Sequence, residues 1–88
     1  MTEPEWVKKL EEEGYIDVTV SRNGPNMKFQ EHFHDRAAVN VILDGEMTMT
    51  DKDNTVVRKK GDRIEIPAGI THTVQCGPEG CTFVAGYK

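Results

Sequence analysis

The sequence lacks the features that mark several large classes of protein. Its 88 residues contain no apolar run near the roughly 20 residues that cross a bilayer, and the acidic start TEPEWVKKLEEEG is unlike a secretory or transit signal. The formal net charge is −4, and basic residues cluster only at Arg58-Lys59-Lys60, which is too little for a nucleic-acid footprint. We therefore expect a soluble, cytoplasmic protein that binds neither membranes nor nucleic acid.

Cysteine is also scarce, with two residues in the chain, Cys76 and Cys81. In a reducing cytosol a pair of buried thiols is the expected state. The intervening GPEG turn could bring the two opposite each other, so a cross-strand disulfide is an alternative, and a reactive Cys76 thiol is a third. A chain of this length buries only about 60–65% of its unfolded surface. A metal, a partner subunit or a disulfide is therefore expected to add stability.

What the sequence does contain is a short helix followed by many strands. Thr2 and Glu5 form a capping box, which predicts an N-terminal helix within residues 1–14. The apolar side of this helix, which should pack on a sheet or on a neighbouring subunit, consists of Trp6, Val7 and Leu10. Over residues 15–88, segments rich in Val, Ile and Thr alternate with turn residues. This pattern predicts an all-β sandwich or barrel in a single domain.

The dipeptide Asp44-Gly45 is a two-residue turn signal, and it predicts a β-hairpin that would place Ala38 opposite Asp51. The interior would then receive Ala38, Asn40, Ile42, Met47 and Met49, and the outer face Val39, Val41 and Leu43. A strand that is apolar on both faces is covered on both sides. We expect the outer face to be covered by the helix, a second subunit or both, which predicts a homodimer.

All three histidines stand in two segments with metal-ligand spacing. In QEHFHDRAAVNVILDG, residues 30–45, His32 and His34 point to the same side of an extended chain. In GDRIEIPAGITHTVQC, residues 61–76, two turns and a short strand precede His72, which opens the next strand. His32 and His34 alone are a metal-ligand arrangement that lacks its remaining ligands.

These segments resemble the two motifs of the cupin superfamily. Four residues stand at the spacing of the second motif: Gly61, Pro67, Gly69 and His72. Three fit the first motif: His32, His34 and Gly45. The departures are Asn26 for a glycine, Ala38 for the glutamate and Cys76 for an asparagine. The resemblance covers residues 26–76 and implies a small single-domain cupin, a double-stranded β-helix or jelly-roll barrel, over residues 15–88.

In cupins with complete motifs, the three histidines and the glutamate bind one divalent metal. The resemblance therefore implies that His32, His34 and His72 hold Fe, Zn, Ni, Mn or Cu, without the acid that Ala38 replaces. Three imidazoles still make a facial site with open positions. Asp51, opposite Ala38 in the predicted hairpin, is a candidate replacement acid, although the run DKDN is typical of a turn.

Two functions stay open at this point. The first is a metal-binding cupin that holds a small-molecule ligand, as a metal-dependent oxygenase or isomerase whose catalytic residues the sequence does not name. The second is a non-catalytic ligand-binding or dimerisation cupin that has lost or weakened its metal site. In both, the residues expected to line the pocket are Asn40, Met47, Met49, Cys76, Phe83 and Tyr87. Asp35 and Arg36 are expected at its rim, as a solvated pair or as a gate.

Overall fold

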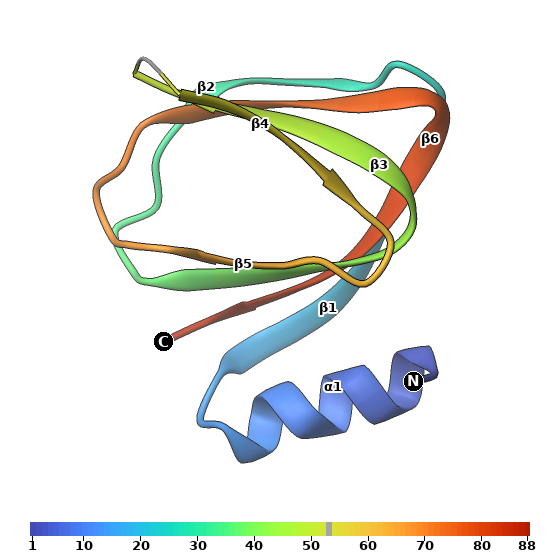
Figure 1. Ribbon diagram of the computed structural model, residues 1–88. Coiled ribbons are helices and arrows are strands. Elements are labelled where there is room, and N and C mark those ends of the chain that lie inside the picture. The colour runs from blue at the N-terminus through green and yellow to red at the C-terminus, as the bar shows by residue number, and fades with distance from the viewer. Residues whose placement is uncertain (53) are drawn as a thin grey trace.

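The computed structural model describes residues 1–52 and 54–88, and it is built mostly of strands (Figure 1). Within these residues, the helix α1 (Glu3–Glu12) is followed by six strands: β1 (Ile16–Asn23), β2 (Lys28–His32), β3 (Ala38–Asp51), β4 (Asn54–Lys59), β5 (Arg63–Ile66) and β6 (His72–Tyr87). Asp53, part of the predicted DKDN turn, lies outside the described residues. The all-β prediction with a short N-terminal helix is confirmed. No helix in the described ranges is long and apolar enough to cross a membrane.

Helix α1 begins as its sequence predicts. The Thr2 hydroxyl accepts a hydrogen bond from the Glu5 backbone N–H at 3.3 Å, and the Thr2 N–H donates to the Glu5 carboxylate at 2.8 Å. This capping box satisfies two backbone donors at the helix start. The apolar side of the helix carries Leu10, which is fully buried. Leu10 belongs to an outer cluster, a group of buried residues that comprises Leu10, Tyr15, Val39, Val41 and Val84.

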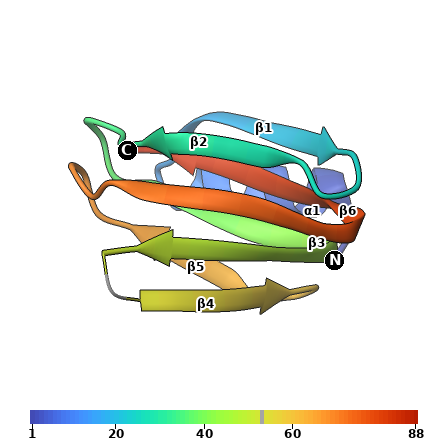
Figure 2. The same cartoon turned by 90° about the horizontal axis from the view of Figure 1, so that it is seen from above.

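Two long bent strands, β3 and β6, build both layers of the fold. Residues 38–45 of β3 pair with residues 81–87 of β6, and this layer is extended by β1 and β5. Residues 47–50 of β3 pair with residues 73–76 of β6, and this layer is extended by β2 and β4. The layers face each other, and α1 lies against the outside of the layer that contains β1 and β5 (Figures 1 and 2). The arrangement is that of a jelly roll whose ladder does not close within the described residues.

The predicted hairpin at Asp44-Gly45 is wrong. β3 continues through this dipeptide as one strand, and its register with β6 shifts there. Ala38 therefore pairs with Ile66 of β5 instead of Asp51. Asp51 pairs with Asn54 at the far end of the layer that contains β4. The outer face of β3 is nevertheless covered as expected, because α1 packs on Val39 and Val41.

The reason for the error lies in the crossing of the two bent strands. Gly45 has a φ of 72°, a left-handed conformation that favours glycine. A side chain at Gly45 would also collide with the carbonyl of Gly80 on β6. The dipeptide therefore marks a bulge where two backbones approach closely, which uses the same residue types as a tight turn.

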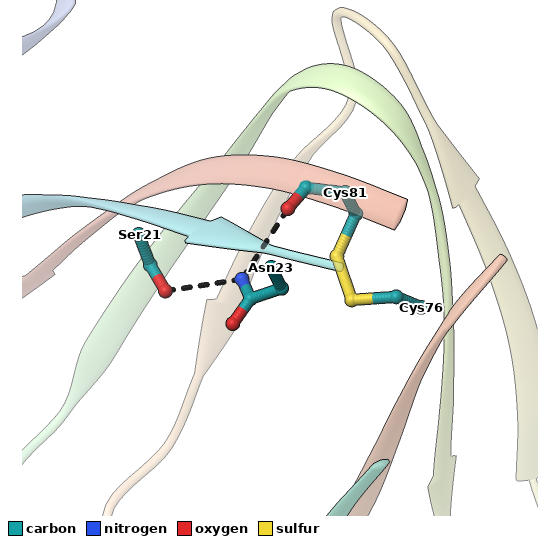
Figure 3. Close-up of a disulfide and its surroundings, with 4 residues drawn as sticks. All are labelled: Ser21, Asn23, Cys76 and Cys81. Atoms are coloured by element: carbon teal, nitrogen blue, oxygen red, sulfur yellow. Dashed lines mark hydrogen bonds between the residues drawn. A yellow bond between two sulfur atoms is a disulfide. The ribbon is translucent and has the colours of Figure 1, made fainter. Parts of the chain in front are cut away.

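The two cysteines differ from the expectation of free thiols. Cys76 and Cys81 form a disulfide with a Cα–Cα distance of 5.4 Å, and both are buried (Figure 3). The Asn23 side-chain amide donates to the Cys81 carbonyl at 3.3 Å and to the Ser21 hydroxyl at 3.1 Å. The crosslink therefore joins the two sides of the bend in β6, and the end of β1 is bonded to it.

The space between the layers holds the second apolar group. We call it the inner cluster; its buried members are Ala38, Ile42, Met47, Ile64, Ile66, Val74, Cys76 and Cys81. The prediction that Ala38, Ile42 and Met47 face the interior is confirmed, although it was derived from the wrong pairing. The alternation of side chains along one strand was sufficient for it, because that alternation does not depend on which strand is the neighbour.

Candidate metal centre

The three histidines come together at one end of the molecule. His32 is the last residue of β2, and it pairs directly with His72, the first residue of β6. His34 lies in the following loop, where its backbone carbonyl accepts a hydrogen bond from the Gly69 N–H at 2.8 Å. One ligand atom from each imidazole lies within 4.8 Å of the others. Two segments 38 residues apart in the chain thus meet in one cluster, as the sequence predicts.

Backbone carbonyls orient two of the rings. The Nδ1 atom of His32 lies 2.7 Å from the carbonyl of Gln30, and Nδ1 of His72 lies 3.1 Å from the carbonyl of Ile70. A carbonyl can only accept, so each Nδ1 carries the proton and donates it. In the neutral tautomer that these contacts select, the lone pair of each ring is on Nε2. This tautomer is the one found in histidines that bind metal through Nε2.

The surroundings of the third imidazole favour its neutral form. Burial lowers the pKa of His34, and the neighbouring rings of His32 and His72 lower it further, while Asp35 raises it to a lesser extent. A neutral imidazole is the form that coordinates a metal. The three rings together fit a divalent ion that accepts nitrogen ligands, such as Zn, Cu, Fe or Ni.

Within residues 1–52 and 54–88, no carboxylate joins the three histidines in place of the acid that Ala38 replaces. Ala38 is buried in the inner cluster, with 4% of its surface exposed. Asp51, the candidate replacement, lines a separate groove of about 150 Å³ that lies between β4 and β5. The Asp51 hypothesis is therefore wrong, because it depended on the hairpin that does not form. Among the described residues, the grouping that could hold a metal consists of histidines alone.

A cavity of about 270 Å³ adjoins the histidines. Its walls comprise Thr19, Ser21, Phe29, His32, His34, Asn40, His72, Val74, Phe83, Ala85 and Tyr87. Three of the expected pocket residues, Asn40, Phe83 and Tyr87, thus lie in its wall. Met47 and Cys76 lie in the inner cluster, and Met49 lines the groove between β4 and β5.

Some wall residues that we did not predict could have been found from the sequence, and others could not. Val74 could have been found, because it stands two residues after His72 and so shares its face. Thr19 and Ser21 come from β1, and their place depends on the pairing of β1 with β6. No local pattern predicts that pairing.

Arg36 lies at the rim of the cavity, but its partner is not the neighbouring Asp35. Its guanidinium donates to the Asp17 carboxylate at 3.2 Å and stands 5.1 Å from the centre of the Tyr87 ring. The Tyr87 ring lies 5.3 Å from that of His34. A cation at this distance is attracted to the face of the aromatic ring. Arg36 therefore packs against Tyr87 of the cavity wall, while its charge is paired with that of Asp17.

Known structures share this architecture. A cupin superfamily protein from Desulfitobacterium hafniense matches with a TM-score of 0.74 and 17% identity, over 80% of this chain and 63% of its own. The cupin domain of CENP-C from Drosophila melanogaster matches with 0.75 and 17%, over 83% and 61%. A variant of oxalate decarboxylase from Bacillus subtilis matches with 0.72 and 22%, over 81% and 20%. At such identities the likeness shows the fold alone.

The extent of the matches is also informative. The chain spans 63%, 61% and 20% of the length of these three neighbours, which is less than two thirds of each. No curated protein matches the chain. The sequence profile of the family Cupin_2, described as a cupin domain, matches residues 19–85 and so covers most of the chain. The protein, with its three clustered histidines in a two-layered jelly roll, therefore belongs to the Cupin_2 family of cupin domains.

Proposed function

We propose that this protein is a small metal-binding cupin that holds one divalent ion at His32, His34 and His72 and a small-molecule ligand in the adjoining cavity. The observation that carries the proposal is the approach of the three imidazoles, whose ligand atoms lie within 4.8 Å of one another. The carbonyl contacts of His32 and His72, which leave both Nε2 atoms free, support it. A bound ion would supply Lewis acidity or a site for dioxygen chemistry.

The residues around the site define what the chain itself contributes. Three neutral imidazoles would leave the charge of the ion uncompensated, which favours an anionic or chelating ligand. Phe29, Val74 and Phe83 would shield that ligand from water. No carboxylate is among the described residues that line the cavity. This lining suits a metal-dependent oxygenase or isomerase that needs no carboxylate base from the protein. It suits less well a hydrolase that depends on such a base.

Elemental analysis of protein purified without a histidine tag tests the metal site. We expect close to one equivalent of metal in the wild type and a large loss in His72→Ala. Thr73→Ala is a matched control, because it changes the next residue of β6, which points away from His72. Failure of the metal-free protein to bind added Fe(II), Zn, Ni, Mn or Cu would contradict the proposal.

Dioxygen consumption separates the enzyme from a binding protein. The Fe(II)-loaded protein would be assayed with small diketones, thiols and phenols, with His72→Ala as the inactive control. Uptake of dioxygen that depends on both the substrate and the three histidines would establish an oxygenase. Stoichiometric metal without turnover, and without isomerisation of the same compounds, would favour the binding function.

A second candidate is a non-catalytic cupin that binds a ligand and forms a homodimer. Two observations favour it: Ala38 replaces the acid with a buried methyl group, and the edge strand β4 exposes Val56 and Val57. One structural neighbour, CENP-C of Drosophila melanogaster, is described as bound to CAL1, a protein partner. Light scattering over a range of concentrations would test the homodimer. A monomer mass throughout would exclude it.

A cytoplasmic location is also proposed. The disulfide between Cys76 and Cys81 argues against it, because such bonds are rare in reducing compartments. Thiol labelling of protein quenched directly from cells would decide the question. Two labelled cysteines would support a cytoplasmic location, and complete protection that a reductant removes would point to an oxidising compartment.

A further inference from the structure

The cavity beside the histidines has two unlike walls. The layer of β2 and the first part of β6 contributes imidazoles together with Phe29 and Val74. The facing layer, formed by β1, β3 and the last part of β6, contributes a different set: Thr19, Ser21, Asn40, Phe83, Ala85 and Tyr87. A ligand in this cavity would therefore meet the metal on one side and hydroxyl and amide groups on the other.

The polar groups of the second wall stand in one row. Ala85 of β6 pairs with Asn40 of β3 on one side and with Thr19 of β1 on the other. Paired residues of neighbouring strands point to the same face of a sheet. The Asn40 amide and the Thr19 hydroxyl thus flank a small methyl group. The row leaves room above Ala85 for a ligand atom that both polar groups could reach.

Asn40 has no partner that would explain its burial. Its side chain is 9% exposed, and no hydrogen bond joins its amide to another residue of the described chain. No fully buried polar atom of the described side chains is left unsatisfied, so the amide must be reached from the cavity. Buried amides are nearly always hydrogen-bonded, because an unpaired one is unfavourable. Solvent that enters the cavity can bond to the amide, and a ligand there would replace that solvent as its hydrogen-bond partner.

Size and charge restrict that ligand further. The cavity has a volume of about 270 Å³, which suits a small ligand of several non-hydrogen atoms. An ion held by three neutral imidazoles keeps its positive charge, which favours an anionic group at the metal. The walls also contribute apolar groups, Phe29 and Val74 on one side and Phe83 on the other, and these suit methylene groups.

We infer that the ligand is a short aliphatic carboxylate that carries a second hydrogen-bonding group. Its carboxylate would bind at the metal held by the three histidines, and its second group would accept a hydrogen bond from the Asn40 amide, assisted by Thr19. This inference rests on the proposed metal site, and it adds the ligand class and the residue that sets specificity.

Isothermal titration of the zinc-loaded protein with two acids tests the inference. Levulinate has the carbon chain of pentanoate with an added keto group, so the pair differs only in the acceptor that Asn40 would bind. One hydrogen bond of ordinary strength predicts that levulinate binds about three- to tenfold more tightly to the wild type. In Asn40→Leu the two acids should bind with equal affinity, while pentanoate keeps its wild-type affinity.

Asn54→Leu is the matched control, because it makes the same change on β4, outside the cavity. It should keep the preference for levulinate. If Asn40→Leu does not fold, Thr19→Val replaces it and should reduce the preference. Equal binding of both acids by the wild type would overturn the inference, and so would a preference that survives Asn40→Leu.

Zinc content is measured first in every sample, so that failure of the metal site can be told apart from failure of the ligand class. Wild-type protein that binds zinc but does not distinguish the acids leaves the metal site intact and overturns the ligand class alone. Wild-type protein that binds no zinc overturns both the proposed function and the inference that depends on it.

Discussion

The two faces of β3 illustrate how one strand can serve stability on one side and binding on the other. Val39 and Val41 point to the outer cluster, where α1 closes an entirely apolar group around Leu10. The opposite face carries Ala38 and Ile42 into the inner cluster, but Asn40 between them lines the cavity. Because successive side chains alternate between faces, neighbouring residues can belong to separate functions. A polar side chain on the outer face of β3 should therefore destabilise the fold. On the inner face, the Asn40 amide is needed to bind the proposed ligand.

The largest expected effect breaks the outer cluster. Leu10→Ala removes a fully buried side chain from beneath the helix, and it should lower the free energy of unfolding by about 2–5 kcal/mol. Zinc affinity at the histidines should not change, because Leu10 contacts only the outer cluster. Urea denaturation and zinc titration measure the two quantities. Glu11→Ala, an exposed position of the same helix, is the control.

A parallel loss of stability and zinc affinity in Leu10→Ala would show that the two faces of β3 are coupled. That result would contradict the separation of roles proposed for them. The measurement would be made at saturating and at limiting zinc, because a bound ion stabilises the folded state by mass action.

Reduction of the disulfide tests whether the stability of the inner cluster can be lowered without loss of zinc binding. The two cysteines are 5 positions apart in the chain, and closing so short a loop is expected to stabilise the fold by about 2 kcal/mol. Reduction of the wild type should lower the free energy of unfolding by that amount without loss of zinc, since neither cysteine lines the cavity. The double variant Cys76→Ala/Cys81→Ala should not respond to the reductant. A reductant-dependent change in that variant would assign the effect to another cause.

These contrasts also show which parts of the fold the sequence could predict. The capping box, the strand-rich remainder and the two histidine segments are local patterns, and the structure confirms each of them. The inward residues of β3 follow from alternation alone. For the same reason, a wrong hairpin still placed Ile42 and Met47 correctly in the interior.

The parts that the sequence could not predict depend on long-range pairing. Asp44-Gly45 carries a turn signal, yet Gly45 lies against Gly80, 35 positions later in the chain. The row formed by Thr19, Ala85 and Asn40 exists only because β6 lies between β1 and β3. No pattern within a single segment specifies that order of strands. The metal ligands could therefore be predicted from motif spacing, and the opposite wall of the cavity could not.

A smaller effect on the free energy of unfolding is expected at Asn40, a polar residue on the inner face of β3. Asn40→Leu replaces an unpartnered amide with an apolar group, and it should raise the free energy of unfolding of the metal-free protein by about 1 kcal/mol. Val41→Asn places an amide on the outer face and should lower it by about 3 kcal/mol or more. Urea denaturation of both variants gives the comparison. A loss of stability in Asn40→Leu would mean that the amide already has a partner in the folded protein.

The smallest effect concerns the ion pair that joins α1 to β5. Arg63 donates to the Glu13 carboxylate at 2.9 Å and 2.5 Å, and these hydrogen bonds lower the pKa of Glu13 from 4.5 to about 2. The unfolded chain binds the proton first as the pH falls, so the stabilisation is fully present above about pH 4.5 and is lost as the pH approaches 2. Glu13→Gln should therefore lower the melting temperature slightly at pH 7 and converge with the wild type near pH 2. Glu12→Gln, at an exposed position of the same helix end, should show no such convergence. The difference in melting temperature between Glu13→Gln and the wild type could instead stay constant from pH 7 to pH 2. That result would mean that the contact stabilises the helix through packing and not through charge.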